Sequence, residues 1–155
     1  MIDSVIFDCD GTLFDSMPAW HALQERFAQK AGIALNPMQL VRLNANTLPE
    51  TAAFFHRECG LGGSVEEVLN DAHQILLGEY RDNVLARSGA VELARRLSGD
   101  GVKLAVASSS PVDFLQAGLE RVGIFDLFDV VASAEGEGRT KSDPRFSASV
   151  AFRLG

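Results

Sequence analysis

The sequence predicts an α/β fold: a parallel β-sheet flanked by helices, with a helical block inserted after the first strand. Three short apolar runs suit buried strands, at residues 4–7, 102–107 and 129–132, and helical patterns follow each of them. Between the first and second runs, residues 16 to about 84 show helical periodicity alone. Because strands that alternate with helices form parallel sheets through right-handed crossovers, the sheet should be Rossmann-like.

This pattern also divides the chain into domains. We expect a core formed by residues 1–15 and 85–155, with residues 16–84 as an inserted helical cap. An insertion that leaves the core directly after a strand end is well placed to act as a lid over that end.

Composition limits the classes of function. The 155 residues are 46% hydrophobic and 23% charged, as in a soluble globular chain, and the net charge of -7 argues against a nucleic-acid or anionic-membrane partner. No stretch is long and apolar enough to span a membrane, and the chain starts on a strand rather than on a signal peptide. Cys9 and Cys59 form no disulfide framework, so we expect a reducing, cytoplasmic compartment.

The first strand, Ser4–Phe7, leads into the most informative stretch of the chain. On an extended backbone Asp8 and Asp10 project to the same side, while Cys9 points away as packing. Two neighbouring carboxylates repel unless a cation or a shared proton offsets their charge, so a metal site with acid–base function is expected. The alternative is a polar turn, since Asp10-Gly11 is a common turn signal.

The helical block is bounded by helix signals. Ser16 is expected to cap the first helix, Asn36 precedes the second, and Ser64 with Glu67 forms a capping-box pattern before the longest. Its histidines are expected to pack or lie at the surface. Four residues are candidates to line the cap side of a binding site, with core packing as the alternative: Trp20, Leu48, Phe54 and Phe55.

After the block, the strand at residues 102–107 ends in Ser108, Ser109 and Ser110. Ser110 is expected to cap the following helix, which has Pro111 in its first turn. Lys141 follows the next strand, and Asp143 is expected to cap the last helix.

Asp8, Ser108 and Lys141 each follow the carboxyl end of a strand, and these ends meet at one edge of a parallel sheet. A carboxylate nucleophile, a hydroxyl donor and a lysine cation fit phosphoryl transfer through an aspartyl-phosphate. In this interpretation Asp8 attacks phosphorus, Asp10 is the general acid and base, and Mg²⁺ bridges Asp8 and a phosphate oxygen. The alternatives are a polar loop at Ser108 and a solvated surface lysine at Lys141.

At this point the chain resembles the haloacid dehalogenase-like superfamily. The family's D-x-D-G-T motif matches residues 8–12, its second-motif hydroxyl matches Ser108, and its lysine followed by x-D-P matches Lys141. The inserted helical cap resembles the β-phosphoglucomutase/phosphoglycolate-phosphatase branch. The resemblance implies a Mg²⁺-dependent enzyme that acts on a small phosphorylated metabolite, with Asp8 and Asp10 at the metal. The residues expected to bind substrate are Gly11, Thr12, Ser108, Ser109 and Lys141.

The sequence departs from the family pattern in two places. The acidic motif that normally follows on a later strand is missing, because the chain ends at Gly155 on the helix before it. We therefore expect a truncated core or an incomplete metal site, and self-association through the exposed sheet edge and apolar helix faces. In the cap, His21 is one residue, about 100° on a helix, from the position of the mutase histidine. The residues from Asn44 to Thr51 also lack the mutase arginine.

Both cap features favour a phosphatase over a mutase. The expected enzyme hydrolyses its substrate through an aspartyl-phosphate intermediate. Two alternatives remain open: a phosphomutase of the β-phosphoglucomutase type, and a catalytically inactive family fragment that serves as a binding module.

Overall fold

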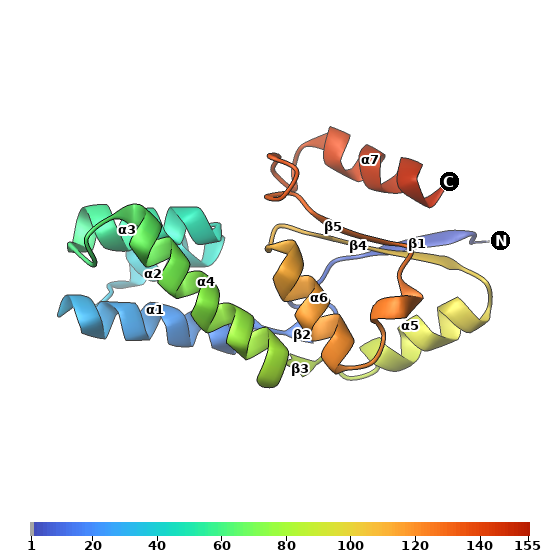
Figure 1. Ribbon diagram of the computed structural model, residues 1–155, viewed down its shortest axis with the longest axis horizontal. Coiled ribbons are helices and arrows are strands. Elements are labelled where there is room, and N and C mark those ends of the chain that lie inside the picture. Colours follow the sequence, from blue (N-terminus) through green and yellow to red (C-terminus); the bar gives the residue numbers. More distant parts are fainter. Residues whose placement is uncertain (1) are drawn as a thin grey trace. The chain divides into compact units, whose positions relative to one another are not determined.

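The computed structural model describes residues 2–155, which form two compact units. One unit consists of the chain up to Met17 together with Tyr80–Gly155, and the other is the continuous segment Pro18–Glu79. The first unit contains a mixed α/β arrangement and the second contains only helices (Figure 1). The predicted fold class, a parallel sheet with an inserted helical block, is confirmed.

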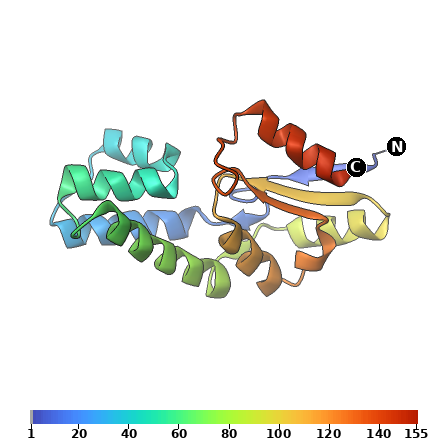
Figure 2. The same cartoon turned by 45° about the horizontal axis from the view of Figure 1, so that its top comes forward.

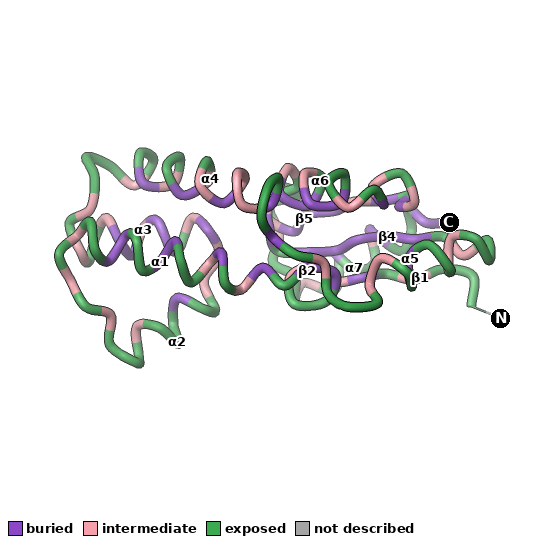
Figure 3. Tube along the Cα trace, turned by 90° about the horizontal axis from the view of Figure 1, so that it is seen from below, coloured by how far each residue is buried: buried purple, intermediate pink, exposed green. Residues whose placement is uncertain are grey.

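The core of the first unit is a three-stranded parallel sheet. Its strands are β1 (Ser4–Phe7), β4 (Lys103–Ser108) and β5 (Val130–Ser133), in the order β1-β4-β5. The register places Phe7 beside Val106 and Ser108 beside Ser133, so β4 and β5 end level with each other and β1 ends two residues earlier at the same edge. Because β4 lies in the centre, it is buried from Leu104 to Ser108 (Figure 3).

Helices cover both faces of this sheet. One face carries α5 (Ala90–Gly99) and α6 (Val112–Arg121), with the short 3₁₀ helix η1 (Phe125–Leu127) nearby; the other carries α7 (Pro144–Leu154) (Figures 1 and 2). Alternate residues of β4 and β5 face α7, since side chains of a strand alternate between its two faces. The buried cluster on that side is Ala105, Ala107, Val130, Ala132, Ala134, Phe146, Val150 and Leu154.

A second, two-stranded sheet lies where the chain leaves and re-enters the first unit. Its strands, β2 (Phe14–Asp15) and β3 (Leu85–Ala86), pair antiparallel, a feature that the sequence pattern did not reveal. Between β1 and β2 the chain makes a tight loop in which Gly11 has a φ of 80°. The Cys9 carbonyl accepts hydrogen bonds from the backbone N–H groups of Thr12, Leu13 and Phe14 at 2.8–3.1 Å.

The second unit is built on α1 (Met17–Ala31), α2 (Pro37–Ala45), α3 (Leu48–Cys59) and α4 (Val65–Asp82). Asn36 and Thr47 close capping boxes at the starts of α2 and α3. The Phe55 ring meets the rings of Phe27 and Phe54 edge to face, with centroids 5.4 and 5.2 Å apart. Aromatic packing of this kind holds the helices together.

One predicted helix cap is wrong. The N-cap of α6 is Pro111 and not Ser110, and no side chain caps this helix. The Ser110 hydroxyl instead donates a hydrogen bond to Asp10, which lies on another segment. A half-buried carboxylate acceptor provides a stronger, charge-assisted hydrogen bond than the helix end does.

The first unit has an edge strand and exposed apolar side chains, the features from which self-association was predicted. Within the described residues β1 pairs with β4 alone, Ile6 is 42% exposed, and Phe152 on α7 is 87% exposed. Self-association through these residues stays a prediction. No helix among residues 2–155 has the length and apolar character that a membrane crossing requires.

Candidate active site

The carboxyl ends of β1 and β4 carry the predicted acid and hydroxyl side chains. Asp8 follows β1 directly, Ser108 is the last residue of β4, and Lys141 lies in the loop between β5 and α7. The parallel register brings these segments to one edge of the sheet. The structure thus brings Asp8 together with Lys141, and Asp10 together with Ser108.

Asp8 uses one carboxylate oxygen for its contacts and leaves the other open. Its Oδ1 accepts an ion pair from Lys141 Nζ at 2.5 Å and a hydrogen bond from the Cys9 backbone N–H at 2.8 Å. The Oδ2 atom accepts no hydrogen bond within the described part of the chain. The side chains are 40% and 43% exposed, so this pair contributes little to stability but leaves a carboxylate oxygen accessible to a ligand.

Asp10, two residues later, meets hydroxyl groups instead of a cation. Its Oδ1 accepts hydrogen bonds from Ser16 Oγ at 2.6 Å and from Tyr80 Oη. Its Oδ2 accepts from Ser110 Oγ at 2.6 Å and from Ser108 Oγ at 3.3 Å. All four hydroxyl-bearing residues are buried. The two carboxylates are therefore placed in different chemical environments.

Packing fixes the hydroxyl groups around Asp10. Tyr80 lies in the last turn of α4, where its ring stacks on Phe114 of α6 with centroids 5.2 Å apart and its carbonyl accepts a hydrogen bond from Arg121. The Ser110 backbone N–H donates to Ser108 Oγ at 3.1 Å. Ser108 and Ser110 thus form a closed arrangement around Asp10 Oδ2.

Cys9 is packing in the structure, as its alternation with the two aspartates indicates. The side chain is fully buried. Burial, and then the charges of Asp10 and Asp8, raise the pKa of its thiol far above the ordinary value of 9.0. Because the thiolate is the reactive form, Cys9 is inert at neutral pH.

Three residues assigned to substrate binding make no contact with Asp8 or Asp10 in the described contacts. The backbone N–H groups of Gly11 and Thr12 donate to Phe14 and Cys9 carbonyls inside the loop, and Ser109 is exposed. Their role in binding stays a prediction.

Sequence reasoning missed Ser16, Ser110 and Tyr80 as neighbours of Asp10. Both serines stand before a proline-containing helix start, and that local signal is the same for a helix cap and for a tertiary hydrogen bond. Tyr80 gave no local signal, because its hydroxyl meets a carboxylate 70 residues away in the chain.

The donor set for Mg²⁺ is sparse. Among the described residues no cluster of three or more His, Cys, Asp or Glu side chains exists. Magnesium needs hard oxygen ligands, and one or two carboxylates with water and substrate phosphate are often sufficient. The open Oδ2 of Asp8 fits that requirement, whereas both Asp10 side-chain oxygens are already occupied by hydroxyl groups.

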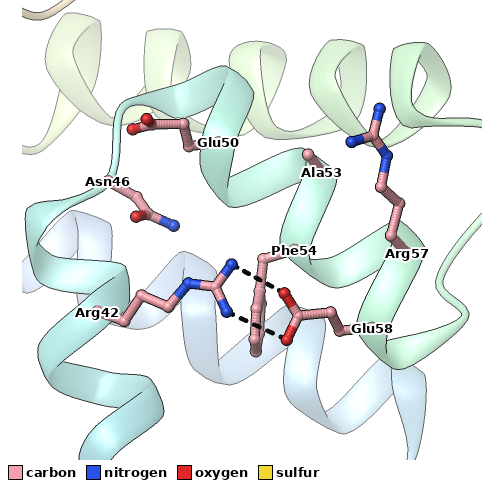
Figure 4. A pocket seen from close by; sticks show the side chains of 7 residues that line it. All are labelled: Arg42, Asn46, Glu50, Ala53, Phe54, Arg57 and Glu58. Carbon is pink, nitrogen blue, oxygen red and sulfur yellow. Dashed lines mark hydrogen bonds and ion pairs between the residues drawn. The ribbon is translucent and has the colours of Figure 1, made fainter.

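The helical unit has a surface pocket of its own, with a volume of about 290 Å³ (Figure 4). Arg42 forms an ion pair with Glu58 at 2.8 Å and lies over the Phe54 ring at 5.3 Å. Of the predicted lining residues, Phe54 borders this pocket. Leu48 and Phe55 are buried in the helical core, and Trp20 is half-buried.

A family model for haloacid dehalogenase-like hydrolases matches residues 2–155. The chain belongs to this family. The predicted resemblance to its β-phosphoglucomutase/phosphoglycolate-phosphatase branch is also confirmed. Hexitol phosphatase B of Escherichia coli is 28% identical over 163 residues, which cover 98% of this chain and 69% of that protein. A phosphoglycolate phosphatase of Psychrobacter arcticus is 26% identical and is matched over 90% of this chain and 64% of its own length.

A solved structure supports the fold of this haloacid dehalogenase-like chain. CbbY from Rhodobacter sphaeroides, determined in complex with phosphate, superposes with a TM-score of 0.79 at 19% identity. The match covers 99% of this chain and 73% of that one. At this identity the likeness concerns the fold.

Proposed function

We propose that this haloacid dehalogenase-like protein hydrolyses a small phosphate monoester through a phosphorylated Asp8. The observation that carries the proposal is the asymmetry of Asp8. One of its oxygens is held by Lys141 at 2.5 Å, and the other is open at the carboxyl edge of the sheet. The phosphatases among its relatives support the same reaction class.

The first step transfers the phosphoryl group to the protein. Asp8 Oδ2 forms a bond to phosphorus as the bond between phosphorus and the leaving oxygen breaks, and Asp10 gives its proton to that oxygen. Lys141 offsets the negative charge that gathers between Asp8 and the phosphate, and the Ser108 hydroxyl donates to a phosphate oxygen.

The second step restores Asp8. Asp10, now a carboxylate, takes a proton from a water molecule whose oxygen attacks phosphorus, and the bond between phosphorus and Asp8 breaks. Inorganic phosphate leaves, and Asp10 again holds the proton that the next leaving group needs.

A magnesium ion held at the Asp8 carboxylate and by water would supply charge neutralisation at the phosphate. We assign residues 16–84 as the cap that selects the substrate. In that segment His21 Nε2 contacts Asn44 Oδ1 at 3.2 Å.

The test is the substitution Asp8→Asn, which removes the nucleophile and keeps the side-chain volume. With an aryl phosphate and Mg²⁺, turnover should fall to background. The thermal midpoint should change little, because the exposed ion pair contributes at most about 1 kcal/mol. The control Asp100→Asn replaces an exposed aspartate at the end of α5 and should keep full activity. Turnover retained by Asp8→Asn would refute the nucleophile. A folded but inactive wild-type chain would instead favour a binding module.

A further inference from the structure

Four hydroxyl groups donate hydrogen bonds to Asp10, which is more than packing alone requires. A carboxylate offers about four lone-pair sites, and the four hydroxyls of Ser16, Tyr80, Ser108 and Ser110 divide two and two between its oxygens. A general acid must give up and regain a proton at one of these oxygens. The hydrogen bonds to Asp10 therefore have to leave one of its two oxygens able to carry that proton.

The contacts distinguish the two oxygens. Oδ1 is bound by Ser16 at 2.6 Å and by Tyr80, whose ring is held by the stack on Phe114. Oδ2 is bound at 2.6 Å by Ser110, but its second donor, Ser108, is at 3.3 Å, the longest contact in the set. Oδ1 is thus the anchored oxygen, and Oδ2 has the weaker partner.

Ser108 also has only one hydroxyl proton to donate. When that hydroxyl turns to a phosphate oxygen, as the proposed function requires, Asp10 Oδ2 loses a donor and gains an open lone pair. Oδ2 is then the Asp10 oxygen that holds the proton which the proposed reaction gives to the leaving oxygen and regains from water.

We propose that Tyr80 and Ser110 are positioning residues for the general acid. Tyr80 and Ser16 hold Asp10 in place through hydrogen bonds to Oδ1. Ser110 orients Oδ2 through its own hydrogen bond, so that the proton on Oδ2 reaches the leaving oxygen when Ser108 donates to the phosphate. This inference rests on the proposed function, because it assumes that Asp10 protonates the leaving group.

Leaving-group chemistry provides the test. An alkyl alkoxide needs a proton to depart, whereas a nitrophenolate does not, so a misplaced acid slows alkyl esters selectively. We therefore compare kcat/KM for an alkyl phosphate and for 4-nitrophenyl phosphate, since this parameter reports the steps up to release of the leaving group. In Tyr80→Phe and Ser110→Ala, kcat/KM should fall about tenfold or more for the alkyl ester, and much less for the nitrophenyl ester.

Two variants serve as controls. Ser110→Thr keeps the hydroxyl and should recover most of the alkyl-ester activity. Ser147→Ala removes an exposed hydroxyl on α7 and should affect neither substrate. An equal fall for both esters in folded Tyr80→Phe and Ser110→Ala would overturn the positioning role. Absence of turnover in the wild-type chain would instead refute the proposed function.

A spectroscopic measurement tests the central contact without turnover. Tyr80 is the only tyrosine of the chain, so its near-ultraviolet absorption can be isolated by difference against Tyr80→Phe. A phenol that donates to a carboxylate absorbs at longer wavelength than one that does not. Asp10→Ala should shift the tyrosine band to shorter wavelength, and Asp100→Ala should leave it in place. An unshifted band in folded Asp10→Ala would contradict the hydrogen bond on which the inference depends.

Discussion

At the scale of single residues, two aspartates two positions apart acquire different chemistry from their neighbours. Asp8 meets a lysine at 2.5 Å and keeps one oxygen open, whereas Asp10 is enclosed by four buried hydroxyls. Different environments are how proteins assign different roles to residues of the same type. Cys9, between them, is fully buried and acquires neither role.

Because the Cys9 thiol is buried, we expect the folded protein to lose stability at alkaline pH. Burial raises its pKa, and Asp10 and Asp8 raise it further, whereas in the unfolded chain the thiol ionises near the ordinary value of 9.0. Above that pH the unfolded state has lost a proton that the folded state retains, so stability falls as pH rises. The contribution is fully present below about pH 9 and declines by at most about 1.4 kcal/mol per pH unit above it.

The measurement is the free energy of unfolding in urea, at neutral pH and at about pH 10, for the wild type and for Cys9→Ala. The difference between the two pH values should be smaller in Cys9→Ala. Cys59→Ala serves for comparison: burial and Glu58 also raise the pKa of Cys59, but it is only half-buried, so its removal should flatten the profile less. Identical pH profiles for the wild type and Cys9→Ala would contradict the prediction.

At the scale of elements, α6 approaches β2 so closely that a side chain at Gly118 would be crowded by the Phe14 ring. A Cβ on Gly118 would lie 3.0 and 3.1 Å from the Cε2 and Cζ atoms of the Phe14 ring, which is fully buried. Phe14 therefore cannot move aside without disturbing its neighbours. The same helix carries Phe114, on which Tyr80 stacks, so its position also matters for the site.

Gly118→Ala should therefore destabilise the protein by about 1–3 kcal/mol through overpacking, even though alanine favours a helix. The matched control is Gly78→Ala in α4, where an added Cβ meets nothing within 4 Å. That change should stabilise the protein by about 0.5–1 kcal/mol. Urea midpoints of the two variants should move in opposite directions; equal stabilisation by both would show that α6 has room to shift.

At the scale of the whole molecule, the proposed anionic substrate meets a chain with a net charge of -7. Long-range repulsion is screened by salt, whereas the short contact that Lys141 makes with Asp8, and would make with a bound phosphate, is screened much less. Local groups must therefore bind phosphate against an unfavourable overall field.

We expect kcat/KM for a phosphate monoester to rise a few-fold as ionic strength increases from about 0.01 to 0.15 M, because the Debye length falls from about 30 to 8 Å. Glu92 in α5 and Asp100 at its C-terminal end are both exposed. The double variant Glu92→Lys and Asp100→Lys should make kcat/KM less dependent on ionic strength. A repeat with a second monovalent salt checks for ion-specific effects. A fall of kcat/KM with salt would show that the local cation, rather than the net charge, dominates the encounter.

The sequence by itself determined the fold class and indicated where the candidate site residues lie, because both follow from local patterns. Apolar runs and helical periodicity identified the three strands of the parallel sheet and the inserted helices, and the carboxyl ends of parallel strands must share one edge. That rule was enough to predict that Asp8, Ser108 and Lys141 lie together. The family resemblance added the motifs that they belong to.

Only the tertiary structure decided which groups surround Asp10. Ser16 and Ser110 carry the local signature of helix caps, yet their hydroxyls donate to the Asp10 carboxylate. Ser110 and Tyr80 reach it across 100 and 70 residues of the chain. The small β2–β3 sheet and the contact between Gly118 and Phe14 are likewise hidden in the sequence. The physical reason is the same in each case: hydrogen bonds and packing between distant segments depend on how the chain folds back, and periodicity carries no information about that.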